Sequence, residues 1–320
     1  MSKFNPEGIQ MKALVKHGST VGVESLVVPV PTQAADVLIR VALAGLCRTD
    51  IYVAESRIPS KNPLILGHEF SGFVEKTLGD GGALKQGDRV AVMPWFAATD
   101  RRLLDGRPSY AAATMMGIDH DGAFSEFVVA PAKVVYRLPG GVSLMQGAYM
   151  EPVAAALAVL NAAIRPEQKG LIFGDNRISR LTERILLAKG FADAAVCGDD
   201  EDLPENDYDF VIETLATTET MRKIVRAVKP GGRIVLKSRQ HAPVAFDINL
   251  LVRKDITLEA VSYGDFQEGI DLVASGKLKV DDLFGDVFLL DQFETAFAES
   301  RRGESMKLFL SAADRDLWAC

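Results

Sequence analysis

The stretch LIFGDNRISRLTERILLAKG, residues 171–190, indicates a strand, a turn containing glycine and then a helix. Residues 171–174 form a short apolar run that ends in glycine, which is typical of a buried strand. Apolar residues then recur at helical spacing, at Ile178, Leu181, Ile185 and Leu186. This stretch therefore predicts one strand–helix unit of a parallel sheet.

The same alternation continues after this stretch. DFVIET (209–214) and GGRIVLKS (231–238) are strand-like, and a helical segment around residues 221–228 separates them. Strands that alternate with helices predict a doubly wound parallel sheet. Its expected limits are residues 153–285.

The sequence on both sides of this region has a different residue pattern. Residues 11 to about 150 contain short runs rich in β-branched residues, bounded by Gly, Pro and Asp, which indicates a β-rich barrel or sandwich. The tail has two strand-like pieces around an amphipathic helix. We expect a first domain of residues 1–152, completed by residues 286–320, so that the fold class is α/β with a separate β-rich domain.

Composition narrows the class of protein. The chain has 320 residues, which is enough for two cores, and a net charge of −7, which argues against a nucleic-acid partner. Three scattered cysteines form no disulfide framework, which favours a cytoplasmic location. We find no signal peptide, and Glu151 and Pro152 interrupt the longest apolar run, so we expect no membrane span.

Two short stretches of the β-rich region carry groups that bind metals. GLCRTDIY (45–52) contains Cys47, and PLILGHEFSG (63–72) contains His68 and Glu69. A thiolate, an imidazole and a carboxylate are ligands that a catalytic zinc uses, with one position left open. Each residue alone is a weak signal, because a lone cysteine is usually a small apolar residue.

In combination, these stretches resemble the signature of the medium-chain, zinc-dependent alcohol dehydrogenases. GDRV (87–90), DGAFSEFVVAPA (121–132) and MEPVAAAL (150–157) agree with it, and the resemblance covers nearly the whole chain. It implies a GroES-like catalytic domain followed by a Rossmann-type nucleotide domain, with one catalytic zinc.

The resemblance also implies roles for single residues. Cys47 and His68 correspond to zinc ligands, and either Glu69 or Glu151 to the carboxylate ligand. Thr49 corresponds to the hydroxyl that relays the substrate proton, with Tyr52 at its outer end. Asp50 corresponds to a group that holds a zinc ligand in place. Arg48 corresponds to a residue that contacts the cofactor pyrophosphate. As an alternative to these roles, Thr49 and Asp50 would only cap a turn. Glu151 would only be a carboxylate in the first turn of a helix.

Many relatives bind a second, structural zinc through four cysteines. The corresponding positions hold Ala97, Asp100, Leu103 and Ala111, none of which supplies a thiolate. We therefore expect one zinc per chain, with the loop held by packing through Trp95, Leu103, Leu104 and Tyr110.

The nucleotide-binding loop departs from the pattern G-x-G-x-x-G. Only Gly174 remains of its three glycines, since Asn176 and Ser179 stand at the other two positions. We expect Asn176 to tolerate the unusual backbone of the second glycine, and Ser179 to be small enough for close helix packing. The expected cofactor site comprises Gly174, Asn176, Arg177, Ile178 and Ser179, together with Arg48 and Asp199.

This domain is also short by about one strand–helix unit. If residues 171–174 and 193–198 form its first two strands, the missing piece is the edge strand beyond them, and Asp199 occupies the place of the ribose-binding acid. In a competing alignment, RILLAKGFAD corresponds to a later helix, and Asp199 is only a loop charge. We favour the first alignment because its strand–helix–strand lengths are normal.

The leading hypothesis is an oxidoreductase that interconverts an alcohol and a ketone or aldehyde of a small polar hydroxylated substrate. The cofactor would be NAD or NADP, with NAD slightly favoured. Arg177 and Arg180 suit a phosphate whereas Asp199 repels one, so these residues do not decide between the two cofactors. The alternatives are a zinc-dependent lyase or isomerase with impaired cofactor binding, and a non-catalytic binding protein. By analogy alone, we expect a homodimer or homotetramer.

Overall fold

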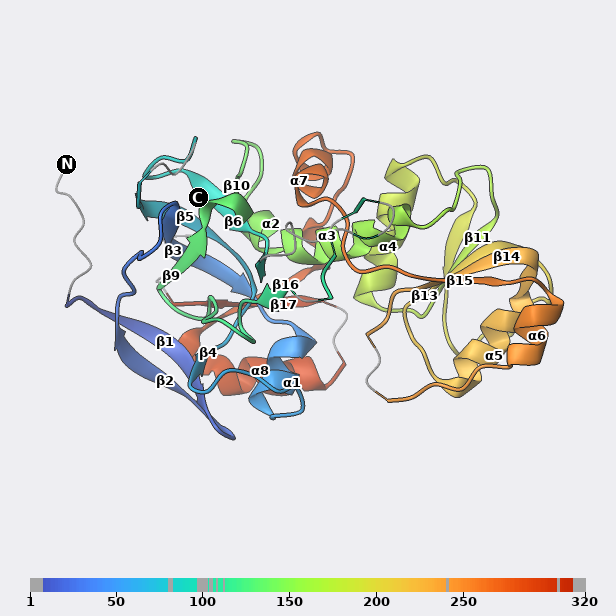
Figure 1. Ribbon diagram of the computed structural model, residues 1–320, viewed down its shortest axis with the longest axis horizontal. Coiled ribbons are helices and arrows are strands. Elements are labelled where there is room, and N and C mark those ends of the chain that lie inside the picture. Colours follow the sequence, from blue (N-terminus) through green and yellow to red (C-terminus); the bar gives the residue numbers. More distant parts are fainter. Residues whose placement is uncertain are drawn as a thin grey trace. The chain divides into compact units, whose positions relative to one another are not determined.

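The structure is a computed structural model that describes residues 8–79, 83–96, 103, 106–107, 109–111, 113–239, 242–303 and 306–312. The chain divides into two compact units: Met1–Glu151 together with Asp281–Cys320, and Pro152–Val280. Figure 1 shows the strands and helices of each unit. Within the described ranges, no helix combines the length and the apolar character needed to cross a membrane.

Antiparallel strands dominate the first unit. Its strands are β1 (Gln10–His17), β2 (Thr20–Val27), β3 (Asp36–Gly45), β4 (Leu64–Ile65), β5 (Glu69–Thr77), β6 (Arg89–Val92), β7 (Trp95–Phe96), β8 (Thr114–Met115), β9 (Phe127–Pro131), β10 (Val135–Arg137), β16 (Phe284–Leu289) and β17 (Lys307–Ser311). The largest sheet has the order β10-β6-β5-β3-β17-β16, with β9 also paired to β3. The smaller sheets are β2-β1-β4 and β7-β8. This is the β-rich domain that the sequence predicts.

Strand β17 brings the end of the chain into the middle of this sheet. It pairs antiparallel to β3, with Phe309 opposite Gly45 and Leu310 opposite Ala44. All five residues of β17 are buried, so that a lysine at its first position, Lys307, lies inside the protein. The helices of the first unit are α1 (Arg48–Ala54), α2 (Leu144–Ala148) and α8 (Phe293–Arg301), and α3 (Met150–Leu157) crosses its boundary.

The second unit contains a five-stranded parallel sheet (Figure 1). Its elements are β11 (Gly170–Phe173), α4 (Arg177–Ala188), β12 (Ala194–Cys197), β13 (Tyr208–Glu213), α5 (Thr218–Ala227), β14 (Val228–Leu236), α6 (Ile248–Arg253), β15 (Thr257–Ala260) and α7 (Phe266–Ala274). The strand order is β12-β11-β13-β14-β15. The chain order reverses between β11 and β13, which is the topological switch point where doubly wound sheets bind ligands.

Alternate residues of the parallel strands enter two separate cores. Ile172, Ile212 and Val235 pack on one face with Leu186 of α4. Leu171, Val211 and Ile234 pack on the other face, where they meet residues of α5 and α6. Because each face is covered, the strands are apolar throughout, and the prediction of a doubly wound sheet is confirmed.

The strand order agrees with the favoured alignment of the nucleotide domain, which stays a prediction. Strand β12 lies at the edge of the sheet, next to β11, and α4 connects the two strands as a regular parallel unit. A Rossmann sheet continues beyond this position, so the predicted missing piece would be the outer edge strand. The centre of the sheet is intact, as the favoured alignment predicts.

Candidate metal centre

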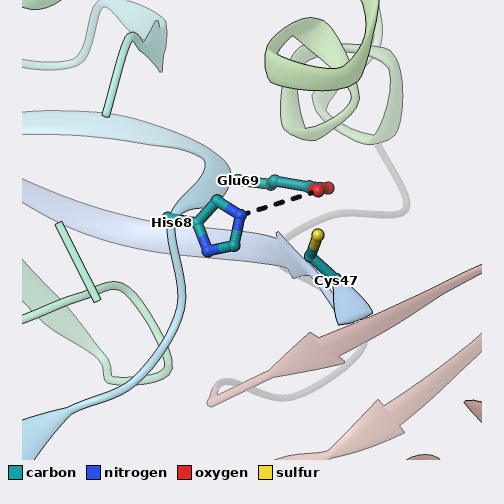
Figure 2. A group of neighbouring side chains, drawn as sticks. All are labelled: Cys47, His68 and Glu69. Carbon is teal, nitrogen blue, oxygen red and sulfur yellow. Dashed lines mark ion pairs between the residues drawn. The ribbon is translucent and has the colours of Figure 1, made fainter. Parts of the chain in front are cut away.

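Strand pairing brings Cys47, His68 and Glu69 together. Cys47 follows β3 and is the N-cap residue of α1, whereas Glu69 begins β5 and His68 immediately precedes it. Strands β3 and β5 pair antiparallel, with Gly45 opposite Glu69. The end of β3 and the start of β5 are therefore adjacent, and the three side chains converge there, as Figure 2 shows.

Gly67 allows the sharp turn that presents His68. Its φ of +97° lies in the left-handed region, and a Cβ at this position would lie 2.6 Å from the ring of Phe124. Any other L-residue would therefore be strained and would collide with the aromatic ring. The glycine before His68 is thus required by the backbone that delivers the imidazole.

The three side chains fit a zinc ion. One ligand atom from each of Cys47, His68 and Glu69 lies within 4.8 Å of the other two, and His68 and Glu69 are each 1% exposed. A tetrahedral zinc holds neighbouring ligand atoms roughly 3.5 Å apart, so small side-chain adjustments suffice to coordinate one. Among the described residues, this is the one group of three or more Cys, His, Asp or Glu side chains with such spacing.

Asp50 contacts two residues of the group, the side chain of His68 and the backbone of Cys47. Its Oδ1 lies 2.9 Å from Nδ1 of His68, and its Oδ2 accepts a hydrogen bond from the backbone N–H of Cys47 at 2.8 Å. A proton on Nδ1 donates to Asp50 and leaves Nε2 with a lone pair for a metal. Asp50 therefore caps the turn, which was the alternative to a role at the metal site, and it also orients the imidazole of His68.

The electrostatic surroundings favour a thiolate at Cys47. Burial alone would raise the pKa of the thiol, but a hydrogen bond from His68 and the charges of His68 and Lys307 lower this pKa to about 6. The pKa of His68 is raised, because the charge and hydrogen bond of Asp50 outweigh the effect of burial. A thiolate is the form of cysteine that binds zinc, so the local charges prepare the site for a cation.

A buried lysine completes the cluster. Nζ of Lys307 forms an ion pair with Oε2 of Glu69, and the two side chains are 0% and 2% exposed. Burial raises the pKa of Glu69 to about 7, although the charge of Lys307 opposes this effect. Oε1 of Glu69 faces Nε2 of His68 at 3.9 Å (Figure 2). Oε2 of Glu69 therefore faces Lys307, whereas Oε1 faces His68 and is available to a metal.

Other predicted residues of the catalytic domain lie outside this group. Glu151 is buried in the first turn of α3 and is not part of the group, so the geometry favours Glu69 as the carboxylate ligand, and this choice stays a prediction. Thr49 and Tyr52 lie on α1 and Arg48 is exposed at its start. Their roles in proton relay and cofactor binding stay predictions.

The loop between β11 and α4 corrects one prediction. Gly174 has a φ of +115°, and a Cβ there would lie 2.5 Å from Oγ1 of Thr214, so this glycine is needed. Asn176, however, has a φ of −143°, an extended backbone that any residue adopts. The expectation that Asn176 replaces glycine by tolerating unusual backbone is therefore wrong. Ser179 is fully buried, as close helix packing requires.

Asn176 instead caps α4. Its Oδ1 accepts hydrogen bonds from the backbone N–H groups of Ile178 and Ser179 at 3.0 and 3.1 Å. Its Nδ2 donates to Oγ1 of Thr214 at 2.9 Å. The side chain of Arg180 bonds Asp175, which offsets the negative charge that the sequence places beside this loop.

A cavity of about 680 Å³ lies beside the carboxyl end of β12. It is lined by Asp175, Arg180, Glu183, Arg184, Val196, Gly198, Asp199, Asp200 and Glu201. Five carboxylates against two guanidinium groups make this lining acidic. Asp199, the predicted ribose-binding acid, is therefore part of the cavity wall at the end of the second strand.

The lobe that holds a structural zinc in relatives is only partly described. Ala97, Asp100 and Leu104 lie outside the described residues. Trp95 and Tyr110 form an edge-to-face ring pair with centroids 5.7 Å apart, as expected for a loop held by packing. Leu103 is 45% exposed, so its predicted packing role is wrong.

Two residues of the sites were not predicted. Lys307 stands in the apolar strand segment MKLFLS, and a lone lysine there is the signal that could have identified it. Thr214 follows the apolar run of β13 and has no distinctive local signal. Only the folded sheet places it beside the loop after β11.

Known proteins resemble the chain in both sequence and fold. Residues 33–140 match the family model of the alcohol dehydrogenase GroES-like domain. The probable D-xylulose reductase A of Aspergillus fumigatus is 26% identical over 97% of this chain and 99% of its own length. That of Neosartorya fischeri is 26% identical over 86% of this chain and 89% of its own length.

Solved structures show the same fold along nearly the whole chain. A zinc-binding dehydrogenase from Sinorhizobium meliloti, bound to NADP, superposes with a TM-score of 0.85 at 23% identity, covering 95% of this chain and 99% of that one. Galactitol-1-phosphate dehydrogenase from Escherichia coli has a TM-score of 0.82 at 22% identity, with coverages of 94% and 99%.

The fold is thus the fold of zinc-binding and polyol dehydrogenases of known structure. Residues 33–140 form an alcohol dehydrogenase GroES-like domain, and the whole chain is similar in sequence to D-xylulose reductases.

Proposed function

We propose that the chain is a zinc-dependent oxidoreductase that interconverts an alcohol group of a small polyol and the corresponding ketone or aldehyde, with NAD(P) as hydride carrier. The observation that carries this proposal is the buried group of Cys47, His68 and Glu69, with His68 fixed by Asp50. The relatives reported above are named as probable D-xylulose reductases, and reduction of this ketose gives a small polyol, which supports a small polyol as substrate.

Cys47, His68 and Glu69 would hold the zinc and leave one position for the substrate oxygen. When bound, zinc supplies a Lewis acid that polarises this oxygen and lowers the pKa of the alcohol. Asp50 keeps the proton of His68 on Nδ1, away from the metal side. Thr49 would accept the substrate proton and pass it outward, and the hydroxyl of Tyr52 on the next turn of α1 would continue this path.

The second unit would bind the nicotinamide cofactor, which supplies or accepts the hydride. Its switch point between β11 and β13 is the position at which this fold binds dinucleotides. Gly174, Asn176, Arg177, Ile178 and Ser179 line the turn there. Arg48 of the first unit remains the predicted contact of the pyrophosphate.

We further propose a preference for NAD over NADP. The cavity at the end of β12 carries Asp199, Asp200 and Glu201, and one of its two arginines, Arg180, already pairs with Asp175. Carboxylates suit the two ribose hydroxyls of NAD, whereas the 2′-phosphate of NADP would meet like charges. The lining of the cavity therefore supports NAD.

A titration of the zinc-loaded protein with NADH and NADPH, followed by nicotinamide fluorescence, tests both parts of the proposal. We expect NADH to bind at least tenfold more tightly, and Asp199→Ser to reduce this preference. Absence of binding for both cofactors at millimolar concentration would refute a dehydrogenase and favour the non-redox alternative, which the comparisons do not support. A panel of four- to six-carbon polyols with NAD then identifies the substrate.

We also propose a homodimer or homotetramer that pairs through the sheet of the second unit. Strand β15 is an edge of that sheet and exposes Leu258, and the neighbouring helix α6 exposes Ile248 and Val252. Exposed apolar side chains at a sheet edge favour pairing with a second copy. Sedimentation equilibrium of the wild type and of a Leu258→Lys variant tests this: we expect the variant to dissociate.

A further inference from the structure

The first turn of α4 is capped from within the chain, at the place where the cofactor of the proposed function would bind. A helix of twelve residues begins at Arg177, directly after the glycine turn that ends β11. The first backbone N–H groups of such a helix have no partner within it, and in a Rossmann fold they bind the cofactor pyrophosphate. In this chain, Oδ1 of Asn176 accepts hydrogen bonds from two of them, those of Ile178 and Ser179.

Thr214 fixes the orientation of the asparagine. Its hydroxyl donates to the backbone oxygen of Phe173 at 2.9 Å, and its oxygen accepts from Nδ2 of Asn176. Since Nδ2 must point toward Thr214, Oδ1 must point toward the helix. The hydroxyl of Ser179, 2.8 Å from Oγ1 of Thr214, adds a third bond to this network.

A glycine at the position of Asn176 would leave these amides free for an anion. The backbone at Asn176 is extended and does not require glycine, so the asparagine is accommodated without strain. The amide oxygen of Asn176 therefore occupies the donors that a phosphate oxygen would use. Arg180 does not compensate, because it is paired with Asp175.

We propose that Asn176 is an internal cap that competes with the dinucleotide pyrophosphate and sets a low affinity for the cofactor. This inference rests on the proposed function. Binding requires the side chain of Asn176 to rotate away from Ile178 and Ser179 and to leave Thr214. The free energy of these bonds is subtracted from the binding free energy, so the cofactor binds weakly and dissociates rapidly.

Three variants of one residue test the competition. Asn176→Gly removes the competing oxygen and keeps a residue that N-cap positions accept, and we expect its Kd for NADH to fall about tenfold, which corresponds to about 1.4 kcal/mol. Asn176→Asp keeps the cap and adds a negative charge, so we expect the Kd to rise about tenfold or more. Asn176→Ala removes the cap but not the Cβ, and its Kd should lie between those of Asn176→Gly and the wild type.

The melting temperature of the cofactor-free protein gives a readout that separates competition from structural damage. We expect Asn176→Asp to melt at or above the temperature of the wild type, because a carboxylate at a helix N-terminus is favourable, although it binds the cofactor least well. Ser143→Gly is the matched control. It removes the cap that Ser143 provides to the N–H of Gln146 in the first unit, and it should leave the Kd for NADH unchanged.

Binding of ADP-ribose and of adenosine locates the effect. ADP-ribose contains the pyrophosphate and should respond to Asn176→Gly as NADH does, whereas adenosine lacks it and should not respond. If the wild type binds NADH and Asn176→Gly binds it equally or less tightly, the competing cap is refuted and the proposed function stands. If neither protein binds NADH or NADPH at millimolar concentration, both are refuted.

Discussion

Lys307 and Glu69 form a buried ion pair across 238 residues of sequence, beside the ligand atom of His68. Strand β17 carries the lysine next to β3, and β5 carries the glutamate on the other side of β3. The pair fixes one carboxylate oxygen of Glu69 and leaves the other facing His68. The proposed zinc site is therefore held by a contact between the two chain segments that make up the first unit.

Removal of the lysine should destabilise the protein strongly. Lys307→Met leaves Glu69 buried beside a methionine, and loss of one partner of a buried ion pair costs about 3–5 kcal/mol. Chemical denaturation of the metal-free protein measures this change in the free energy of unfolding. The double variant Lys307→Met/Glu69→Leu removes both charges and should recover most of the loss. If the double variant is no more stable than the single one, the pair is not the source of the effect.

Gly45 provides the space for this pair. A Cβ at this position would lie 2.6 Å from Cε of Lys307 and 2.7 Å from Oε2 of Glu69. We expect Gly45→Ala to destabilise the protein by about 1–3 kcal/mol through overpacking. Gly22→Ala is the matched control, because its strand β2 offers open space at that point. Equal denaturation midpoints for the two variants would contradict the crowding.

Zinc content tests the ligand set directly. We expect one zinc per chain in the wild type by elemental analysis, and loss of most of it in Cys47→Ser and His68→Ala. Cys197→Ser should retain the metal, because Cys197 lies at the end of β12 in the other unit. Two zinc ions per chain would show that a structural site is present after all.

Asp50 should control the affinity of the site without binding the metal. Asp50→Asn replaces the carboxylate that orients both His68 and the backbone of Cys47, and loss of such an orienting group costs about 10–100-fold in zinc affinity. Competition with a chelator of known affinity measures this change. Asp36→Asn is the control, because Asp36 is a buried carboxylate that accepts hydrogen bonds from the nearby backbone N–H groups of Thr32 and Gln33.

Cys47 and Cys197 should become reactive in different pH ranges. A thiol reacts as its thiolate, which forms above its pKa. Since the pKa of Cys47 is about 6 and that of Cys197 about 11, alkylation of the metal-free protein at pH 7.5 should modify Cys47 and spare Cys197. Mass spectrometry of the alkylated peptides between pH 5 and pH 9 should give a midpoint near 6 for Cys47. A midpoint near 9 would contradict the proposed charges around it, and added zinc should protect the thiol.

The sequence by itself determined the class of fold and pointed to Cys47 and His68, two of the residues that the structure brings together. Apolar runs and glycine turns encode strands and helices locally, so the alternation after residue 152 was sufficient to predict a doubly wound sheet. Cys47 and His68 lie in short stretches whose residue order is itself the signal. The shortened nucleotide unit was likewise visible as a missing length of chain.

Only the tertiary structure decided which other groups join these donors. Glu69 and Glu151 were equivalent candidates in the sequence, and the pairing of β3 with β5 places Glu69, not Glu151, in the group. The pairing of β17 with β3 adds Lys307, and the switch point of the parallel sheet places Thr214 beside Asn176. The physical reason is that local patterns encode an element and its buried face. Contacts between elements distant in sequence depend on strand order and register, which no single stretch specifies.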